Sequence, residues 1–169
     1  MDYKIANVKV SIKTSPIVLD NVVEKCQQNG LYCKNYKNFL VIKNEYTYIM
    51  FKKNQQNENH INITKIPTLD LVGVAISRIK DLTNCVVTSQ TIDNIIASTS
   101  IKKRLNLQSV AKLFPSVKYN NEKFPGLFIK SQLGTAILFH SGKIVIVGSK
   151  KEKHIKCLIQ SICARILTK

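Results

Sequence analysis

The chain has 169 residues, enough to bury one good core in a single domain or in two small fused ones. Apolar residues make up 44% of it, which excludes a disordered chain, and no apolar run reaches the roughly 18 residues that a membrane helix needs. The 26 Lys and Arg against 10 Asp and Glu give a net charge of +16, so we expect a polyanionic partner, most often nucleic acid. The alternative is a solvated lysine-rich surface.

Lysine supplies nearly all of the basic charge, and only Arg78, Arg104 and Arg165 are arginine. Because lysine is a point charge on phosphate whereas arginine forks onto base edges, this bias favours contact with a nucleic-acid backbone. The five cysteines form no C-x-x-C pair and the three histidines stand apart from them, so we expect reduced thiols and no metal site. The sequence has no paired carboxylates in a recognisable frame, no phosphate loop and no Cys/His nucleophile arrangement, so we expect neither an enzyme nor a cofactor.

The first half predicts the order β-α-β-β-β-β-α. Alternating apolar residues indicate a strand over 3–12, Pro16 marks the first position of a helix, and Pro67 begins a second one. The buried stripe of the first helix is predicted as Val18, Val22, Val23 and Cys26. Further strands are expected over 31–35, 39–43, 46–51 and 62–64, with a polar loop over 53–59.

The second half repeats this plan. Strands are expected over 86–99, 117–119, 127–130, 135–139 and 143–147, and helices over 106–113 and 150–167. Landmarks recur at similar offsets: Asn7 and Asn94, Phe51 and Phe139, Phe39 and Phe124. This recurrence predicts an internal duplication, with repeats over 1–83 and 84–169.

One stretch of the second half carries a family motif. It reads FPGLFIK over 124–130, an apolar strand ending in Phe139, SGK over 141–143, and an apolar strand ending in GSK at 150. Both strands are apolar on both faces, so we expect a layer on each: the chain's own helices and a partner. In order, spacing and turn residues the stretch resembles the second repeat of the TATA-binding protein family, strongly over 91–167 and weakly over 3–83.

The resemblance implies an α+β fold: a saddle of two pseudo-symmetric β-α-β-β-β-β-α repeats forming one curved antiparallel sheet, with helices on the convex face. In the family the concave face lies on the DNA minor groove, and two Phe of each repeat wedge between base steps, which is the handling of DNA for which this family is the standard case. The matching residues are Phe39, Phe51, Phe124 and Phe139. For any one Phe alone, core packing is the ordinary alternative.

The resemblance also assigns contacts to the minor groove. Asn7 and Asn94 match the family's central asparagines, whose amide donors suit the acceptors of A·T pairs, and the alternative is an ordinary strand asparagine. The other matching positions are Lys9, Ile96, Thr64, Val145 and Val147. Lys9 replaces an aliphatic residue and Val147 replaces a threonine, so we expect weaker apolar discrimination of A·T sequence than in the family.

Phosphate contacts match Lys43, Lys130, Lys143 and Lys150. The second half carries 14 basic and 3 acidic residues against 12 and 7 in the first, so binding should weaken steeply with salt. In the family the outer side recruits general transcription factors IIA and IIB and the RNA polymerase machinery. The loop 119–123 matches the factor IIB contact, and Glu122 is the acidic residue kept there.

The sequence therefore predicts a transcription initiation factor that binds and bends A·T-rich promoter DNA and nucleates a preinitiation complex, with no membrane or metal partner. Two alternatives stay open: a saddle kept as an interaction scaffold for transcription machinery, and a saddle that docks RNA–DNA hybrids or damaged DNA. We expect the nucleus as its location. A viral factory in the host cytoplasm, or the virion, is the alternative that the Lys/Asn/Ile-rich composition suggests.

Overall fold

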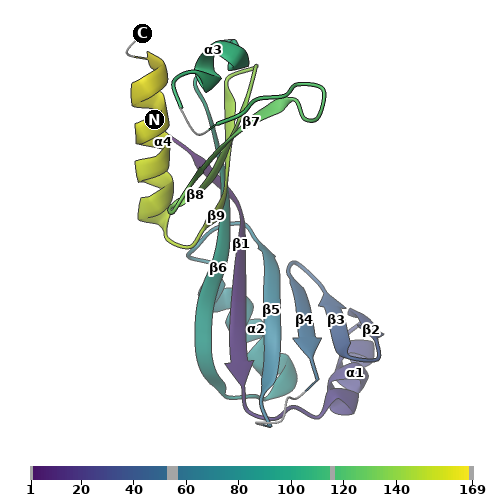
Figure 1. Cartoon of the computed structure of the whole chain (residues 1–169). Coiled ribbons are helices and arrows are strands. Elements are labelled where there is room, and N and C mark those ends of the chain that lie inside the picture. Colours follow the sequence, from purple (N-terminus) through teal and green to yellow (C-terminus); the bar gives the residue numbers. More distant parts are fainter. Residues whose placement is uncertain (1, 53–56, 115–116, 168–169) are drawn as a thin grey trace. The chain divides into compact units, whose positions relative to one another are not determined.

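The computed structural model describes residues 2–52, 57–114 and 117–167 (Figure 1). Its elements in chain order are β1 (Lys4–Thr14), α1 (Leu19–Gln28), β2 (Tyr32–Asn35), β3 (Phe39–Lys43), β4 (Thr47–Phe51), β5 (Asn59–Ile66), α2 (Val72–Thr83), β6 (Val87–Ser100), α3 (Leu107–Ala111), β7 (Gly126–Ser131), β8 (Gly134–Phe139), β9 (Lys143–Ser149) and α4 (Glu152–Leu167). Within these described residues, no helix is both long enough and apolar enough to span a membrane.

The strands form one nine-stranded antiparallel sheet in the order β2-β3-β4-β5-β1-β6-β9-β8-β7. The chain divides into two compact units, Asn7–Asp93 on the one hand and Met1–Ala6 with Asn94–Lys169 on the other. We call them the first and second units; β1 and β6 run through both. The repeat boundaries expected between residues 83 and 84 remain a prediction.

In the first unit, α1 and α2 cover one face of the sheet (Figure 1). Alternate residues of each strand point to that face, which is why Leu40, Ile42 and Met50 are fully buried. The hydroxyl of Tyr48 stays in this core because it has a hydrogen-bond partner. Tyr48 donates its hydroxyl to the Ala75 carbonyl at 3.0 Å, which fixes α2 on β4.

In the second unit, α4 packs on β8 and β9, and α3 packs on β7. Ile155, Leu158, Ile159 and Ile162 recur at helical spacing and form the buried stripe of α4. The SGK turn closes on a neighbouring loop: Ile101 donates to the Gly142 carbonyl at 3.0 Å and Leu105 to the His140 carbonyl at 2.8 Å. A side chain at Gly142 would run into the Lys103 backbone, so this turn requires glycine.

Both helices of the first unit begin later than predicted, and the contacts give the reason for α1. The Ile17 N–H donates to the side-chain oxygen of buried Asn59 at 2.9 Å, and Ser15 pairs through its backbone with Val86 at 2.8 Å. These bonds hold residues 15–18 extended, so α1 starts at Leu19 and not at Pro16. Val18, assigned above to the buried stripe, is 63% exposed.

Three further predictions differ from the structure. The second helix of the first unit begins at Val72, after a turn that follows Pro67. Residues 117–119 form no strand, because Val117 turns back to donate its N–H to the Phe114 carbonyl at 2.9 Å. The second half therefore has three strands after its short helix, not four. Of the polar loop predicted over 53–59, residues 53–56 lie outside the described residues and Asn59 already belongs to β5.

Candidate nucleic-acid interface

Each unit has a sheet face that no helix of the described residues covers, and we call it the open face. Its side chains alternate with the buried ones and are half-buried or exposed. In the first unit they are Asn7, Lys9, Ser11, Phe39, Val41, Lys43, Thr47, Ile49, Phe51, His60, Asn62 and Thr64. In the second unit they are Asn94, Ile96, Ser98, Phe128, Lys130, Thr135, Ile137, Phe139, Lys143, Val145 and Val147. Phenylalanine and aliphatic side chains that stay half-exposed on a face without helices mark an interaction surface.

A pair of phenylalanine rings meets at the same place on each open face. The ring centroids of Phe39 and Phe51 are 6.1 Å apart, and those of Phe124 and Phe139 are 6.2 Å apart. Phe124 is 38% exposed, although rings of this size are usually buried. The structure thus brings the four predicted wedge residues together as two matched pairs.

The two pairs are built in different ways, which the sequence offset did not show. Phe39 lies opposite Phe51 in the ladder, whereas Gly126 lies opposite Phe139, so Phe39 corresponds in register to Gly126 and not to Phe124. A Cβ atom at Gly126 would lie 2.7 Å from Cε1 of Phe124. The Phe124 ring therefore fills the space that a side chain at position 126 would take, which is where Phe39 carries its own ring.

A third ring supports each pair, and the sequence analysis missed both. Tyr36 stacks on Phe39 with centroids 4.7 Å apart, and Phe128 lies 4.9 Å from Phe124. Phe128 is 40% exposed. The signal was available: both residues sit within four positions of a predicted wedge, and Phe128 alternates with the buried strand residues Leu127 and Ile129. Each trio presents a larger stacking surface than a lone ring.

Asn7 and Asn94 are held in the same way. The side-chain oxygen of Asn7 accepts from the Lys65 N–H at 2.9 Å, and that of Asn94 accepts from the Gly148 N–H at 2.7 Å. Lys65 and Gly148 both have positive φ, 64° and 80°, where β5 and β9 are irregular in register. Because a backbone N–H must meet the amide oxygen, each amide nitrogen is left as the donor group for a ligand.

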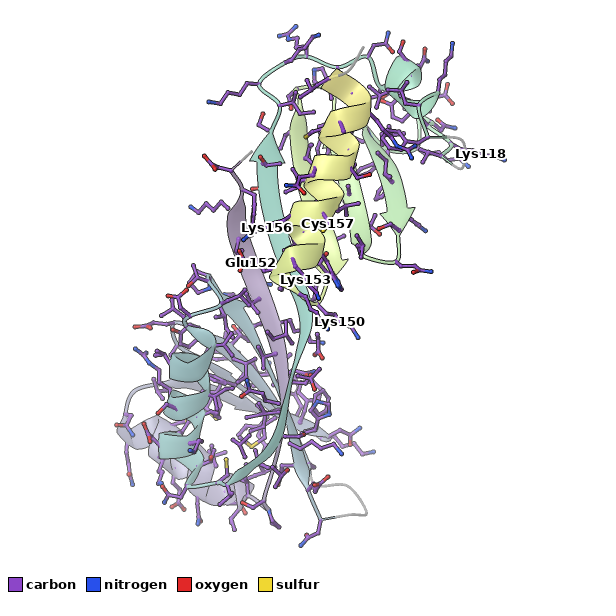
Figure 2. The ribbon with its side chains drawn as sticks, turned by 90° about the vertical axis from the view of Figure 1, so that its left-hand side faces the viewer. Lys118, Lys150, Glu152, Lys153, Lys156 and Cys157 are labelled. Carbon is purple, nitrogen blue, oxygen red and sulfur yellow. The ribbon has the colours of Figure 1, made fainter. Side chains whose placement is uncertain are left out.

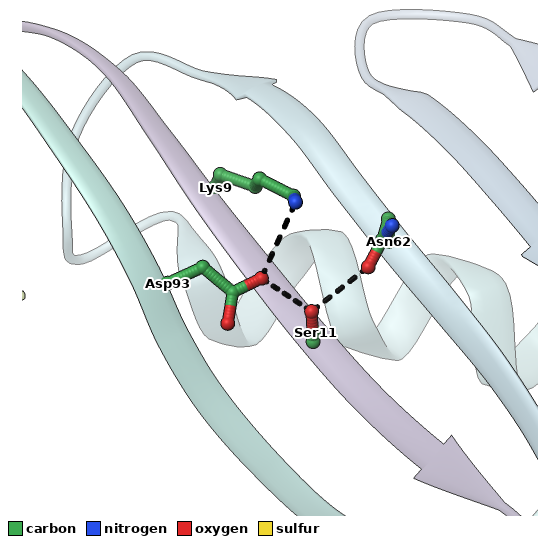
Figure 3. A network of polar contacts seen from close by, with 4 residues as sticks. All are labelled: Lys9, Ser11, Asn62 and Asp93. Atoms are coloured by element: carbon green, nitrogen blue, oxygen red, sulfur yellow. Dashed lines mark hydrogen bonds and ion pairs between the residues drawn. The ribbon is translucent and has the colours of Figure 1, made fainter. Parts of the chain in front are cut away.

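The first unit's open face carries a polar cluster that the sequence analysis did not predict (Figure 3). Lys9 Nζ lies 3.6 Å from Oδ2 of Asp93, and their side chains are 39% and 29% exposed. Ser11 Oγ contacts the same carboxylate oxygen and lies 2.8 Å from Oδ1 of Asn62. The corresponding residues of the second unit, Ile96 and Val145, are apolar. We call Lys9, Ser11, Asn62 and Asp93 the polar quartet.

The predicted phosphate residues do not all share one face. Lys43, Lys130 and Lys143 are exposed at strand positions of the open faces, and Lys43 Nζ lies 4.9 Å from the Tyr32 ring centroid. Lys150 instead lies in the link between β9 and α4, close to the N-terminal part of that helix in Figure 2.

At the start of α4, Glu152 accepts from the Tyr3 hydroxyl and pairs with Lys156 at 3.3 Å (Figure 2). The Tyr3 hydrogen bond, helped by Lys156, lowers the pKa of the Glu152 carboxyl. Burial, with the Glu152 contact, raises the pKa of Tyr3 to about 12. This tie fastens β1 to α4 within the second unit.

Glu122, the predicted partner contact, is exposed in a turn before β7, where its N–H donates to Asn120 Oδ1 at 2.9 Å. Across the described parts of the chain, no three His, Cys, Asp or Glu side chains gather into a group that could hold a metal ion. The arrangement offers apolar rings, amide donors and lysines to a ligand.

Known proteins resemble this chain most strongly in its second half. The family model described as "Transcription factor TFIID (or TATA-binding protein, TBP)" matches residues 89–169. A TATA-box-binding protein of Pyrobaculum calidifontis is 33% identical over 76 residues, which cover 44% of this chain and 38% of the relative. TATA-box-binding protein E of Halobacterium salinarum is 46% identical over 61 residues, 35% of this chain and 33% of the relative.

The matched stretches thus span little more than a third of these relatives' own length. The fold extends the likeness to the whole chain. The structure of Methanococcus jannaschii TBP matches with a TM-score of 0.81 and 25% identity, covering 100% of both chains. The first half, which lies outside the residues that the family model matches, therefore shares the fold.

Proposed function

We propose that this chain, which belongs to the TATA-binding protein family, is a transcription initiation factor that binds A·T-rich promoter DNA through its open faces. Membership of this family of transcription factors confirms two expectations from the sequence: an α+β fold with one open antiparallel sheet, and a chain that is not an enzyme. The observation that carries the proposal is the recurrence of one exposed ring pair, at 6.1 and 6.2 Å, on the helix-free face of both units.

The rings fit a minor-groove ligand for an energetic reason. Unstacking a base step costs a few kcal/mol, and an aromatic wedge offsets this by stacking on the exposed base while the bend brings more surface into contact. Phe124 and Phe139 form the wedge of the second unit, and Phe39 and Phe51 that of the first. DNA bent at the two wedges is the expected product.

The two asparagines fit the same ligand. Both orientations of an A·T pair present only acceptors in the minor groove, adenine N3 and thymine O2. The amide nitrogens of Asn7 and Asn94 are donors, and their oxygens are already held by backbone N–H groups. Thr64 and Val147, at the strand positions beside these contacts, complete the proposed groove surface.

Lysines at the margins of the open faces supply the proposed contacts with phosphate. Lys130 and Lys143 are exposed on the second unit, and Lys43 on the first. We expect log Kd to rise with log salt concentration, and each lysine replaced by alanine to lower that slope by about 1. Lys150 belongs to the same proposal through its place beside β9.

The test compares an A·T-rich duplex, a G·C-rich duplex and an RNA of equal length, with bending measured by energy transfer between the duplex ends. We expect the A·T-rich duplex to bind most tightly and to bend, and the double variant Phe124→Ala, Phe139→Ala to lose the bend. Tyr119→Ala, which removes an aromatic residue outside the sheet, is the matched control. Equal weak binding to all three, abolished by salt, would instead support the interaction-scaffold alternative.

Nucleation of a preinitiation complex is part of the proposal. Glu122 and the loop 119–123 are the proposed contact with a factor of the IIB kind, and factors of the IIA kind and the polymerase machinery are the other proposed partners. A pull-down with Glu122→Lys against the unchanged chain tests this contact apart from DNA binding. The proposed site of action is the nucleus, or a viral factory or virion if the chain is viral.

A further inference from the structure

We propose that the polar quartet of Lys9, Ser11, Asn62 and Asp93 lets the first unit accept a G·C base pair at a position where the second unit accepts only A·T. The inference deepens the proposed function and rests on it. It concerns one chemical group: the N2 amino group of guanine, the single donor that a G·C pair adds to the minor groove.

The quartet holds more hydrogen-bond acceptors than donors. The Ser11 hydroxyl has one proton, yet it lies against two acceptor oxygens, Oδ2 of Asp93 and Oδ1 of Asn62. It can donate to only one of them at a time, so one acceptor is always left over. Lys9, at 3.6 Å, balances the charge of Asp93 without approaching as closely as a good hydrogen bond.

These acceptors are accessible from the open face. The Asp93 side chain is 29% exposed. In Figure 3, Asn62 lies on the other side of Ser11 from Asp93. A guanine amino group that approaches this face would find an oxygen acceptor in place of an apolar surface. An amino group that donates to a carboxylate gains a charge-assisted bond, which is stronger than a neutral one.

The second unit gives the opposite environment. Its residues at the corresponding positions are Ile96 for Lys9 and Val145 for Asn62, and Ala6 corresponds to Asp93 by the repeat offset. The serine alone is kept, because Ser98 lies opposite Val145 as Ser11 lies opposite Asn62. A guanine amino group buried against these aliphatic side chains would find neither the carboxylate nor the amide oxygen, and would lose the charge-assisted bond that the first unit offers. The two units therefore differ in what they tolerate, although their rings and asparagines agree.

The experiment uses inosine, which is guanine without the N2 amino group. Four A·T-rich duplexes are compared. Two carry one G·C pair or one I·C pair in one half of the site, and the other two carry such a pair in each half. The ratio of Kd for G·C to Kd for I·C isolates the amino group. Since the chain can bind in either direction, a dye on exposed Cys157 and a second dye at one duplex end report its orientation by energy transfer.

For the unchanged chain we expect a ratio within about threefold for one substituted half, and a ratio of about tenfold or more when both halves are substituted. The dye should show the quartet's unit placed on the half that holds G·C. The triple variant Lys9→Ile, Asn62→Val, Asp93→Ala copies the second unit and keeps the net charge. It should raise the single-half ratio to about tenfold. Because Kd for G·C is divided by Kd for I·C on the same variant, a change in its general affinity for DNA cancels in this ratio.

A second ion pair supplies the control. Arg78 and Glu45 lie 3.0 Å apart on the helix side, and replacing both by alanine is also neutral in charge and should not move the ratio. Val145→Asn, which places an acceptor in the second unit, should lower the penalty for substitution of both halves. This variant keeps the test open if the triple variant fails to fold.

The inference is overturned if the unchanged chain shows the tenfold penalty with either half substituted, or if the triple variant leaves the ratio as it was. Failure of the proposed function gives a different result. In that case the pure A·T and I·C duplexes themselves bind no better than RNA, and both proposals fall together.

Discussion

Alanine at position 126 should displace the Phe124 ring without removing it. The new Cβ would lie 2.7 Å from Cε1 of Phe124 and 2.9 Å from Cγ2 of Ile137. Both distances are well inside the roughly 3.5 to 4.0 Å at which carbon atoms attract, so one neighbour must move. Phe124 is 38% exposed and Ile137 sits within the β8 ladder, so the ring is the part that gives way.

The displaced ring leaves two partners, Phe139 at 6.2 Å and Phe128 at 4.9 Å. At about 0.5 to 1.5 kcal/mol for each aromatic pair, the loss is about 1 to 3 kcal/mol of the energy that holds the wedge. Part of the loss in stability, roughly a third, is recovered, because alanine restricts the unfolded chain more than glycine by about 0.4 to 1 kcal/mol. DNA bending should therefore fall much more than the free energy of unfolding.

Bending is measured by end-to-end energy transfer on the A·T-rich duplex, and stability by urea titration. We expect Gly126→Ala to bend DNA as poorly as Phe124→Ala. In the double variant Phe124→Ala, Gly126→Ala, the alanine at 126 has no ring to displace, so it should have no further effect on bending. Bending at the unchanged level in Gly126→Ala, or additive effects of the two substitutions, would refute the account of how this wedge is built.

Three further predictions concern stability and reactivity. Asn59→Ala should lower the free energy of unfolding in urea by about 2 to 4 kcal/mol. It removes the partner of the Ile17 N–H and of the Phe51 carbonyl, each 2.9 Å from the Asn59 side chain. A loss under about 1 kcal/mol would contradict this. Gly142→Ala, at φ 85° and against the facing loop's backbone, should also destabilise by more than about 1 kcal/mol, whereas Gly73→Ala, a helical site with nothing within 4 Å, should stabilise by about 0.5 to 1 kcal/mol. Burial raises the pKa of the Cys26 thiol to about 12, so at pH 8 a thiol reagent followed by mass spectrometry should modify exposed Cys157 first, and equal rates at the two residues would show that α1 opens readily.

The sequence predicted the elements that depend on local patterns. Alternation and β-branched runs placed all nine strands of the described residues, with one strand too many, and the SGK turn and FPG motif identified the second repeat. It misplaced the start of α1 because the cause lies 42 residues away, in the bond from Ile17 to the Asn59 side chain. It predicted a strand at 117–119 by symmetry, although the local backbone turns back on Phe114. Symmetry between repeats is a weaker guide than the hydrogen bonds available to each.

The candidate site divides in the same way. Four phenylalanines and two asparagines could be chosen because they match the positions of the family that the sequence resembles. The register that places Gly126, and not Phe124, opposite Phe139 could not be read from an offset. Nor could the polar quartet, since Asp93 and Asn62 come together only through pairing of strands far apart in the chain.

The two units agree where a wedge needs them to agree and differ where base pairs are read. Their ring pairs match to within 0.1 Å although one ring comes from position 39 and the other from two residues before its register position. The arrangement is thus maintained by two different sequences, as expected if both rings meet the same kind of ligand. On its open face the first unit carries the polar quartet, where the second unit carries Ile96 and Val145. A symmetric face would bind a duplex equally well in both directions, so this difference in polarity is what would give the bound chain a direction along DNA.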